Sequence, residues 1–169
     1  MAYITTRLYP SPYGNLVLGS FDNKLCLCNW QNKKNKVAVN NRLLRHLNAE
    51  FIEGDSPVLM QTISQLDDYF SNKRTTFELP LLMAGTDFQE QVWQTLLKVP
   101  FGQTLSYQQL AQNIAHKKAV RAVANANAAN AISIIIPCHR IIGINGKLVG
   151  YAGGLAAKQG LLELEQAIG

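Results

Sequence analysis

Hydrophobic residues in the first thirty positions come in short runs and not at helical spacing. Residues 4–9, 16–21 and 25–30 are rich in β-branched, aromatic and leucine side chains. The stretches between them, Pro-Ser-Pro-Tyr-Gly and Asp-Asn-Lys, are rich in turn formers. Short apolar runs joined by tight turns are typical of an antiparallel meander. We therefore predict three strands, at 4–9, 16–21 and 25–30.

The spacing of apolar residues then changes to three and four, which is typical of helices. One predicted helix covers 42–51 and ends on Phe51, and a second begins at the N-cap Ser56 and the first-turn Pro57. Beyond that helix the chain becomes irregular over 73–82.

This irregular stretch is where we expect one domain to end and another to begin. Residues 1–82 are predicted to form an α+β domain with a structural role, because no chemical site is recognisable there. Residues 83–169 are predicted to form the second domain, which carries the candidate chemistry.

Two capping boxes mark helices in the second half. The pairs are Thr86 with Gln89 and Ser106 with Gln109. At this spacing, each side chain of a pair can accept a hydrogen bond from the backbone N–H of the other residue. The helix after Ser106 is short, and a basic connection at 116–118 leads to another short helix at about 119–129. Two short helices joined in this way predict a helix-turn-helix.

The second of these two helices is composed mostly of alanine, and Arg121 is its one long charged side chain. A slim helix suits close approach to a narrow groove, so its composition favours contact with the DNA minor groove over base reading in the major groove. The alternative is a small-residue helix packed in a core, with Arg121 extended to solvent.

The stretch 133–140, Ser-Ile-Ile-Ile-Pro-Cys-His-Arg, is the candidate reactive site. Three consecutive isoleucines predict a strand buried on both faces, and Pro137 should end that strand. Cys138 would then be held at a fixed point. His139 is next to it, and an imidazole is the usual proton acceptor for a thiol that acts as a nucleophile.

A histidine base needs a third group that fixes its tautomer, and Glu165 is our candidate. It shares one stripe of the last predicted helix, at about 156–168, with Leu161 and Leu162. A carboxylate on an apolar stripe is costly to bury without a partner, although it could instead be partly exposed and idle. Glu163 faces the other way and should be solvated.

Composition and charge set the wider class. The chain of 169 residues is 47% hydrophobic with a formal charge of +5, which fits a globular domain with a polyanionic partner but does not require one. Its three cysteines, Cys26, Cys28 and Cys138, are not spaced like metal ligands or a disulfide scaffold. With no apolar run long enough for a membrane span, we expect a cytoplasmic protein with no membrane contact, metal or cofactor.

Four motifs together resemble one family. They are Ser-Tyr-Gln-Gln-Leu-Ala at 106–111, Arg-Ala-Val-Ala-Asn-Ala at 121–126, Pro-Cys-His-Arg at 137–140 and Gly-Tyr-Ala-Gly-Gly at 150–154. In this combination the chain resembles the O6-alkylguanine-DNA alkyltransferases, also called methylated-DNA-protein-cysteine methyltransferases. The resemblance implies a ribonuclease H-like N-terminal domain with a three-stranded antiparallel sheet. It also implies a winged-helix-like C-terminal domain that binds double-stranded DNA, flips a base and repairs it, as a monomer.

The resemblance also assigns roles in the reaction. Cys138 matches the acceptor that takes the alkyl group from guanine O6 irreversibly, so that each molecule reacts once, with O4-alkylthymine as a further candidate substrate. His139 matches the water-mediated base, and Glu165 matches the group that orients it. Tyr107 matches the tyrosine that assists the leaving guanine, and Asn130 matches a hinge whose side chain holds the turns.

Binding residues are implied in the same way. Arg121 matches the finger that fills the vacated base stack, and Tyr107, Gln108, Ala122 and Ala128 belong to the matching DNA-binding surface. Ala128 stands where some members have a second DNA-contacting arginine, and the alanine would weaken DNA binding.

The lesion itself is expected to contact a loop and two carbonyl groups. Tyr151 and Ala152 match the lesion-binding loop, and the carbonyls of Cys138 and Ile141 match those that read the guanine amine. Members of the family often have serine at the position of Ala152, so here only the backbone amide would remain to contact O6.

Two other classes remain open from the sequence. One is a DNA-binding regulator in which Cys138 senses alkylation or oxidation, although the alanine-rich helix has few base-reading side chains. The other is a Cys-His hydrolase, although the local signatures of the cysteine protease families are absent.

Overall fold

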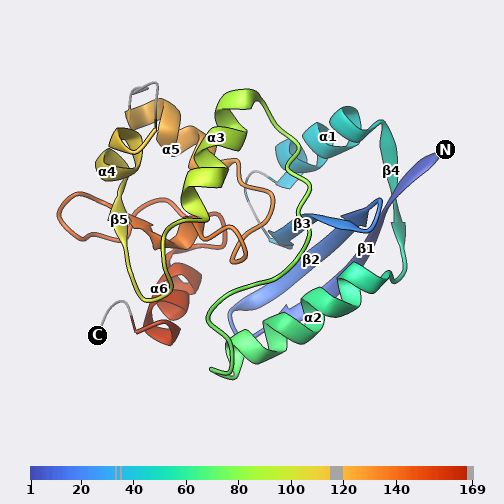
Figure 1. The fold of residues 1–169 in the computed structure, drawn as a ribbon, viewed down its shortest axis with the longest axis horizontal. Coiled ribbons are helices and arrows are strands. Elements are labelled where there is room, and N and C mark those ends of the chain that lie inside the picture. The colour runs from blue at the N-terminus through green and yellow to red at the C-terminus, as the bar shows by residue number, and fades with distance from the viewer. Residues whose placement is uncertain (33, 35, 115–119, 167–169) are drawn as a thin grey trace.

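The computed structural model describes the whole chain except residues 33, 35, 115–119 and 167–169. It contains a four-stranded sheet with two helices in the first half and a group of short helices in the second (Figure 1). The α+β class is therefore confirmed. None of the described helices is long and apolar enough to cross a bilayer.

The three predicted strands are present as β1 (Ala2–Ser11), β2 (Gly14–Phe21) and β3 (Lys24–Trp30), paired antiparallel in chain order. A fourth strand, β4 (Ala49–Glu53), adds to β1 in parallel and gives the order β3-β2-β1-β4. The expected three-stranded sheet is thus one strand short of the observed one.

This fourth strand corrects the prediction of a helix over 42–51. Helix α1 (Lys36–Leu47) ends before Asn48, which adopts the left-handed conformation with φ of 47°. A residue in that conformation stops a helix, and Phe51 consequently lies in β4. Helix α2 (Pro57–Phe70) begins as predicted, with the Ser56 side chain accepting from the Leu59 amide, and it packs across β1, β2 and β3.

The outer edge of β3 is covered by two segments from later in the chain. The amide of Leu25 donates to Pro80, and the carbonyl of Leu25 accepts from Leu82. Further along, the amide of Cys28 donates to Ala131 and its carbonyl accepts from Ser133. The segment that leads to Cys138 is therefore hydrogen-bonded to the sheet of the first half.

The second half contains α3 (Asp87–Leu96), α4 (Tyr107–Gln112), α5 (Val120–Ala128) and α6 (Leu155–Leu164). Both predicted capping boxes are present, at Thr86 and at Ser106. Two short strands, β5 (Leu105–Ser106) and β6 (Ile141–Ile142), pair in parallel beside α4. Helices α4 and α5 pack together, as expected for a helix-turn-helix, and the basic connection predicted at 116–118 lies outside the described residues.

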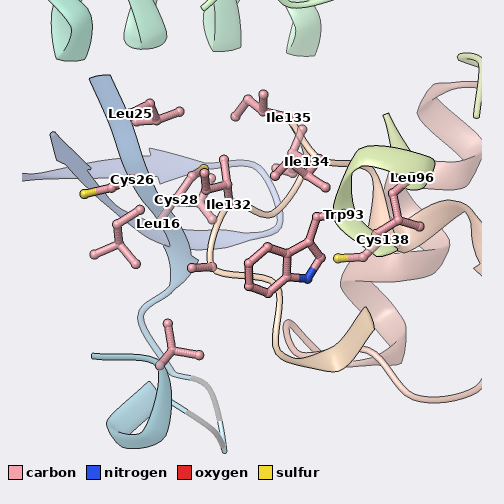
Figure 2. Packing of buried hydrophobic residues seen from close by; sticks show 14 of the residues in the cluster. Leu16, Leu25, Cys26, Cys28, Trp93, Leu96, Ile132, Ile134, Ile135 and Cys138 are labelled. Atoms are coloured by element: carbon pink, nitrogen blue, oxygen red, sulfur yellow. The ribbon is translucent and has the colours of Figure 1, made fainter. Parts of the chain in front are cut away.

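The predicted strand at 134–136 is wrong, although its burial is correct. Ile134 adopts φ of 73° and lies in a turn in which the Ile135 amide donates to Ser133 and the Ile136 amide to Ile132. Continuous apolar residues indicate burial but not backbone conformation, and here a tight turn is buried whole. Figure 2 shows Ile132, Ile134 and Ile135 in the same cluster as Trp93, and Cys138 belongs to that cluster too.

Candidate active site

The candidate nucleophile is fixed by a side chain on the preceding helix end. Cys138 begins the 3-10 helix η1 (Cys138–Arg140) directly after Pro137 and is only 4% exposed. The Asn130 side chain accepts from the Ile132 amide at 3.0 Å and donates to the Ile136 carbonyl at 2.9 Å. The same amide nitrogen lies 3.2 Å from the Cys138 sulfur. Asn130 thus shapes the buried turn and places a hydrogen-bond donor beside the sulfur.

The imidazole of His139 is fully buried and lies against Glu165. Its Nε2 is 2.8 Å from a carboxylate oxygen of Glu165, the residue that directly follows α6. An ionised carboxylate only accepts hydrogen bonds, so Nε2 carries the proton and Nδ1 keeps its lone pair. Nδ1 has no hydrogen-bond partner among the described residues, which makes it the available basic atom.

Glu165 is held as an anion. Burial by itself would raise its pKa, but hydrogen bonds from His139 and Arg140, together with the positive charge of Arg140, lower the pKa to about 2. Arg140 donates through Nε to one oxygen at 2.8 Å and through Nη2 to the other at 3.1 Å. The Tyr69 hydroxyl donates to the second oxygen at 2.6 Å. The helix predicted to 168 ends at Leu164, and Ile168 lies outside the described residues.

His139 is held neutral by the same surroundings. Burial lowers its pKa, and the nearby charges of Arg140 and Lys158 lower it further, while Glu165 acts in the opposite direction. A neutral imidazole with a fixed tautomer beside a thiol can take a proton from that thiol.

A groove of about 630 Å³ opens next to this site. Its walls come from α4, α5, the loop before α6 and the end of β3, and they include Tyr107, Ala128, Tyr151, Ala152, Asn32 and Lys34. Asn32 and Lys34 follow β3, so the first half of the chain contributes to the groove. Four residues singled out from the sequence therefore line one surface.

The loop in the groove is supported from the first half of the chain. Trp30, at the end of β3, donates its indole N–H to the Tyr151 hydroxyl at 3.2 Å. Gly153 packs on the same indole, and a Cβ there would come within 2.6 Å of it. The Tyr107 hydroxyl is 3.3 Å from the carbonyls of Val149 and Gly150. The loop thus packs between the side chains of Trp30 and Tyr107.

The predicted DNA-contacting positions are distributed over α4 and α5. Gln108, Arg121 and Ala128 are exposed and Ala122 is partly buried. The two carbonyls expected to read the lesion already accept one hydrogen bond each, that of Cys138 from the Ile141 amide and that of Ile141 from Lys158. A carbonyl oxygen has a second lone pair, so both remain able to accept another.

Reasoning from the sequence missed several residues of the site, of which Lys158 is the clearest. Its side chain is fully buried and also donates to the Val149 carbonyl at 2.9 Å, and burial lowers its pKa to about 8. A signal was present, because Lys158 lies on the same apolar stripe as Leu161 and Glu165. The contacts of Tyr69, Trp30 and Arg140 were also missed, because each of these residues acts through a partner distant in sequence. Arg140 lies in the Pro-Cys-His-Arg motif, but nothing in that motif points to Glu165.

Two short packed helices beside a groove, with a buried cysteine followed in the chain by a histidine that contacts a carboxylate, are the arrangement expected of a nucleic-acid-binding protein with a reactive thiol. Comparison with known families makes this more specific. Residues 4–83 match the family model "6-O-methylguanine DNA methyltransferase, ribonuclease-like domain", and residues 87–167 match "6-O-methylguanine DNA methyltransferase, DNA binding domain".

Individual relatives agree with these models. The chain is 40% identical to the methylated-DNA–protein-cysteine methyltransferase of Methanosarcina acetivorans over 94% of this chain and 96% of that protein. It is 50% identical to the Mycobacterium leprae protein of the same name over 63% of this chain and 64% of that protein. The chain therefore belongs to the 6-O-methylguanine DNA methyltransferase family.

Solved structures have the same fold. The crystal structure of the O6-methylguanine methyltransferase of Mycobacterium tuberculosis superposes with a TM-score of 0.81 at 36% identity, covering 99% of this chain and 94% of that one. A structure of that protein in complex with DNA gives a TM-score of 0.80, covering 98% of this chain and 93% of that one.

Proposed function

We propose that this protein repairs O6-alkylguanine in double-stranded DNA by moving the alkyl group to Cys138, once per molecule. The observation that carries the proposal is the environment of Cys138: an amide donor 3.2 Å from its sulfur and, next in the chain, a neutral imidazole whose Nε2 is held by Glu165. Membership of the methyltransferase family supports the same reaction.

In this reaction the thiol proton passes to Nδ1 of His139 through a bridging water, and the Cys138 thiolate attacks the alkyl carbon. The bond from that carbon to guanine O6 breaks as the carbon–sulfur bond forms. The electron pair stays on the guanine, which takes up one proton with the help of Tyr107. The product is a thioether, which is stable in water, so the protein is consumed.

The groove supplies recognition in this proposal. Helix α5 enters the minor groove of the DNA, and Arg121 fills the gap left by the flipped base. Tyr151 and Ala152 then contact the flipped ring, as do the carbonyls of Cys138 and Ile141. O4-alkylthymine is a second substrate that the same groove would accept.

The organisation of the chain is also part of the proposal. We expect a cytoplasmic monomer without metal or cofactor, divided into a structural domain at 1–82 and a reactive domain at 83–169. One buried core runs through both domains, so they should unfold together.

A regulator that senses alkylation through Cys138 is the main rival. Such a protein would bind an undamaged operator sequence tightly, whereas a repair protein would bind undamaged duplexes weakly and without sequence preference.

Intact-protein mass spectrometry with a duplex that contains one O6-methylguanine tests the proposal. We expect a gain of one methyl group per molecule, mapped to Cys138, with no gain at the buried Cys26 and Cys28. Cys138→Ala should remain unmodified and Cys26→Ala should react normally. Lesion binding without any mass change would overturn the proposal in favour of the sensor, and repeated turnover would point to a different enzyme.

A further inference from the structure

Tyr69 links the first half of the chain to the candidate active site. It lies near the end of α2, is 1% exposed, and reaches Glu165 across the interface between the two halves. Its ring is held by neighbouring aromatic rings, with centroids 5.1 Å from Phe70, 5.4 Å from Phe77 and 6.3 Å from Phe101. The hydroxyl is thus held at one place.

The carboxylate oxygen that Tyr69 contacts is the one that contacts His139. This oxygen, Oε2, accepts from Tyr69 at 2.6 Å, from His139 at 2.8 Å and from Arg140 at 3.1 Å. Donors on one oxygen share its negative charge, so each weakens the hold of the carboxylate on the others. Burial and the charge of Glu165 raise the pKa of Tyr69, so it remains a neutral donor throughout the working pH range.

We propose that Tyr69 is a positioning residue that fixes the Glu165 carboxylate and limits the basicity of His139. The first half of the chain then sets the proton affinity of the base and is more than a structural support. This inference rests on the proposed function, because it assigns a role within the same proton path.

Removal of the hydroxyl should raise the proton affinity of His139. Without the Tyr69 donor, more charge on Oε2 is available to an imidazolium at His139. The other groups around His139 stay in place: Glu165 favours its charged form, Arg140 and Lys158 oppose it, the Tyr151 ring packs at 6.5 Å, and Cys138 is adjacent in the chain. The acid limb of the rate profile should therefore move to higher pH.

The chain offers a matched control. Tyr9 also donates to a carboxylate at 2.6 Å, but its partner is Asp67 of α2, and the pair lies within the first half. Tyr9→Phe and Tyr69→Phe remove the same kind of hydrogen bond, and only the second touches the candidate site.

The test measures transfer to Cys138 from free O6-benzylguanine, which needs no DNA, over a range of pH. We expect the acid-limb midpoint to rise by about half a pH unit in Tyr69→Phe and to stay at the wild-type value in Tyr9→Phe. Equal shifts in both variants, or none in Tyr69→Phe, would overturn the inference. Failure of the wild-type protein to take up the methyl group from an O6-methylguanine duplex would instead reject the proposed function.

Two NMR measurements need no substrate. The His139 ring signals should titrate at higher pH in Tyr69→Phe than in the wild type. Should that variant be unfolded, the Tyr69 hydroxyl proton of the wild type serves instead, and we expect its resonance to move as His139 titrates. A hydroxyl signal that stays constant through that titration would contradict the coupling of Tyr69 and His139 through Oε2 of Glu165.

Discussion

The buried cluster around His139 and the exposed positions of helices α4 and α5 are built in opposite ways. His139, Arg140 and Glu165 are fully or almost fully buried, and both carboxylate oxygens are hydrogen-bonded. Arg121 and Gln108, on the helix-turn-helix, are exposed. The first arrangement fixes one protonation state through many contacts, whereas the second leaves long side chains available to a partner. Substitutions in the buried region should therefore slow the transfer step, whereas substitutions in the exposed region should affect only the reaction with duplex DNA.

The largest effect is expected from Glu165→Gln. The amide cannot hold an imidazolium at His139 electrostatically, so transfer to Cys138 should slow by about 100-fold, while lesion binding should change little. Single-turnover transfer and DNA binding measured in parallel would separate these effects. Glu163→Gln, an exposed change two residues earlier, in α6, is the control. Full activity in Glu165→Gln would remove Glu165 from the proton path.

Stability should also depend on Glu165, with a defined dependence on pH. Its pKa is about 2 in the folded chain against the ordinary value of 4.5. Because the folded value is depressed, the contribution is present above pH 4.5 and is lost as the pH falls through 4.5 towards 2. In urea unfolding at neutral pH, the free energy of unfolding of Glu165→Gln should be about 3 kcal/mol lower than that of the wild type. This difference should disappear as the pH falls from 4.5 towards 2. A gap that is constant with pH would contradict the assignment.

Arg121→Ala should have a smaller effect, confined to duplex DNA. Under the proposed function Arg121 fills the vacated base stack, so its loss should slow repair of a duplex by about tenfold and leave transfer from free O6-benzylguanine unchanged. Both rates are measured with Arg45→Ala as the control, since Arg45 is exposed on α1 in the first half. Equal slowing with both substrates would place the effect of Arg121 in the reactive region instead.

Ala152→Ser should produce the smallest effect and in the opposite direction. A serine hydroxyl in the groove adds one hydrogen bond to O6 of the flipped base, which should accelerate transfer by about fivefold. The comparison is made by single-turnover kinetics on O6-methylguanine duplexes. Ala156→Ser, exposed on α6, is the control. An unchanged or lower rate would indicate that O6 does not approach this side chain.

Much of the fold was predictable because its signals are local. The turn residues between β1, β2 and β3, the N-cap Ser56 and the capping boxes at Thr86 and Ser106 act within a few positions of themselves. Strand β4 was missed because Phe51 continues the helical spacing of Leu43 and Leu47, and only the left-handed Asn48 ends the helix. The isoleucine run was misjudged because burial on all sides looks the same for a strand and for a buried turn.

The sequence alone determined the reactive elements of this protein: a cysteine and a histidine after a proline, a carboxylate on an apolar stripe, a slim helix with one arginine and a glycine-rich loop. The tertiary structure decided how they are coupled. Tyr69 and Glu165 are 96 positions apart, and Trp30 and Tyr151 are 121 apart. Neither contact leaves a pattern in its own neighbourhood, because a hydrogen bond between distant residues depends on how the whole core packs. The same packing decides which nitrogen of His139 holds the proton, because the deciding contact is with the distant Glu165.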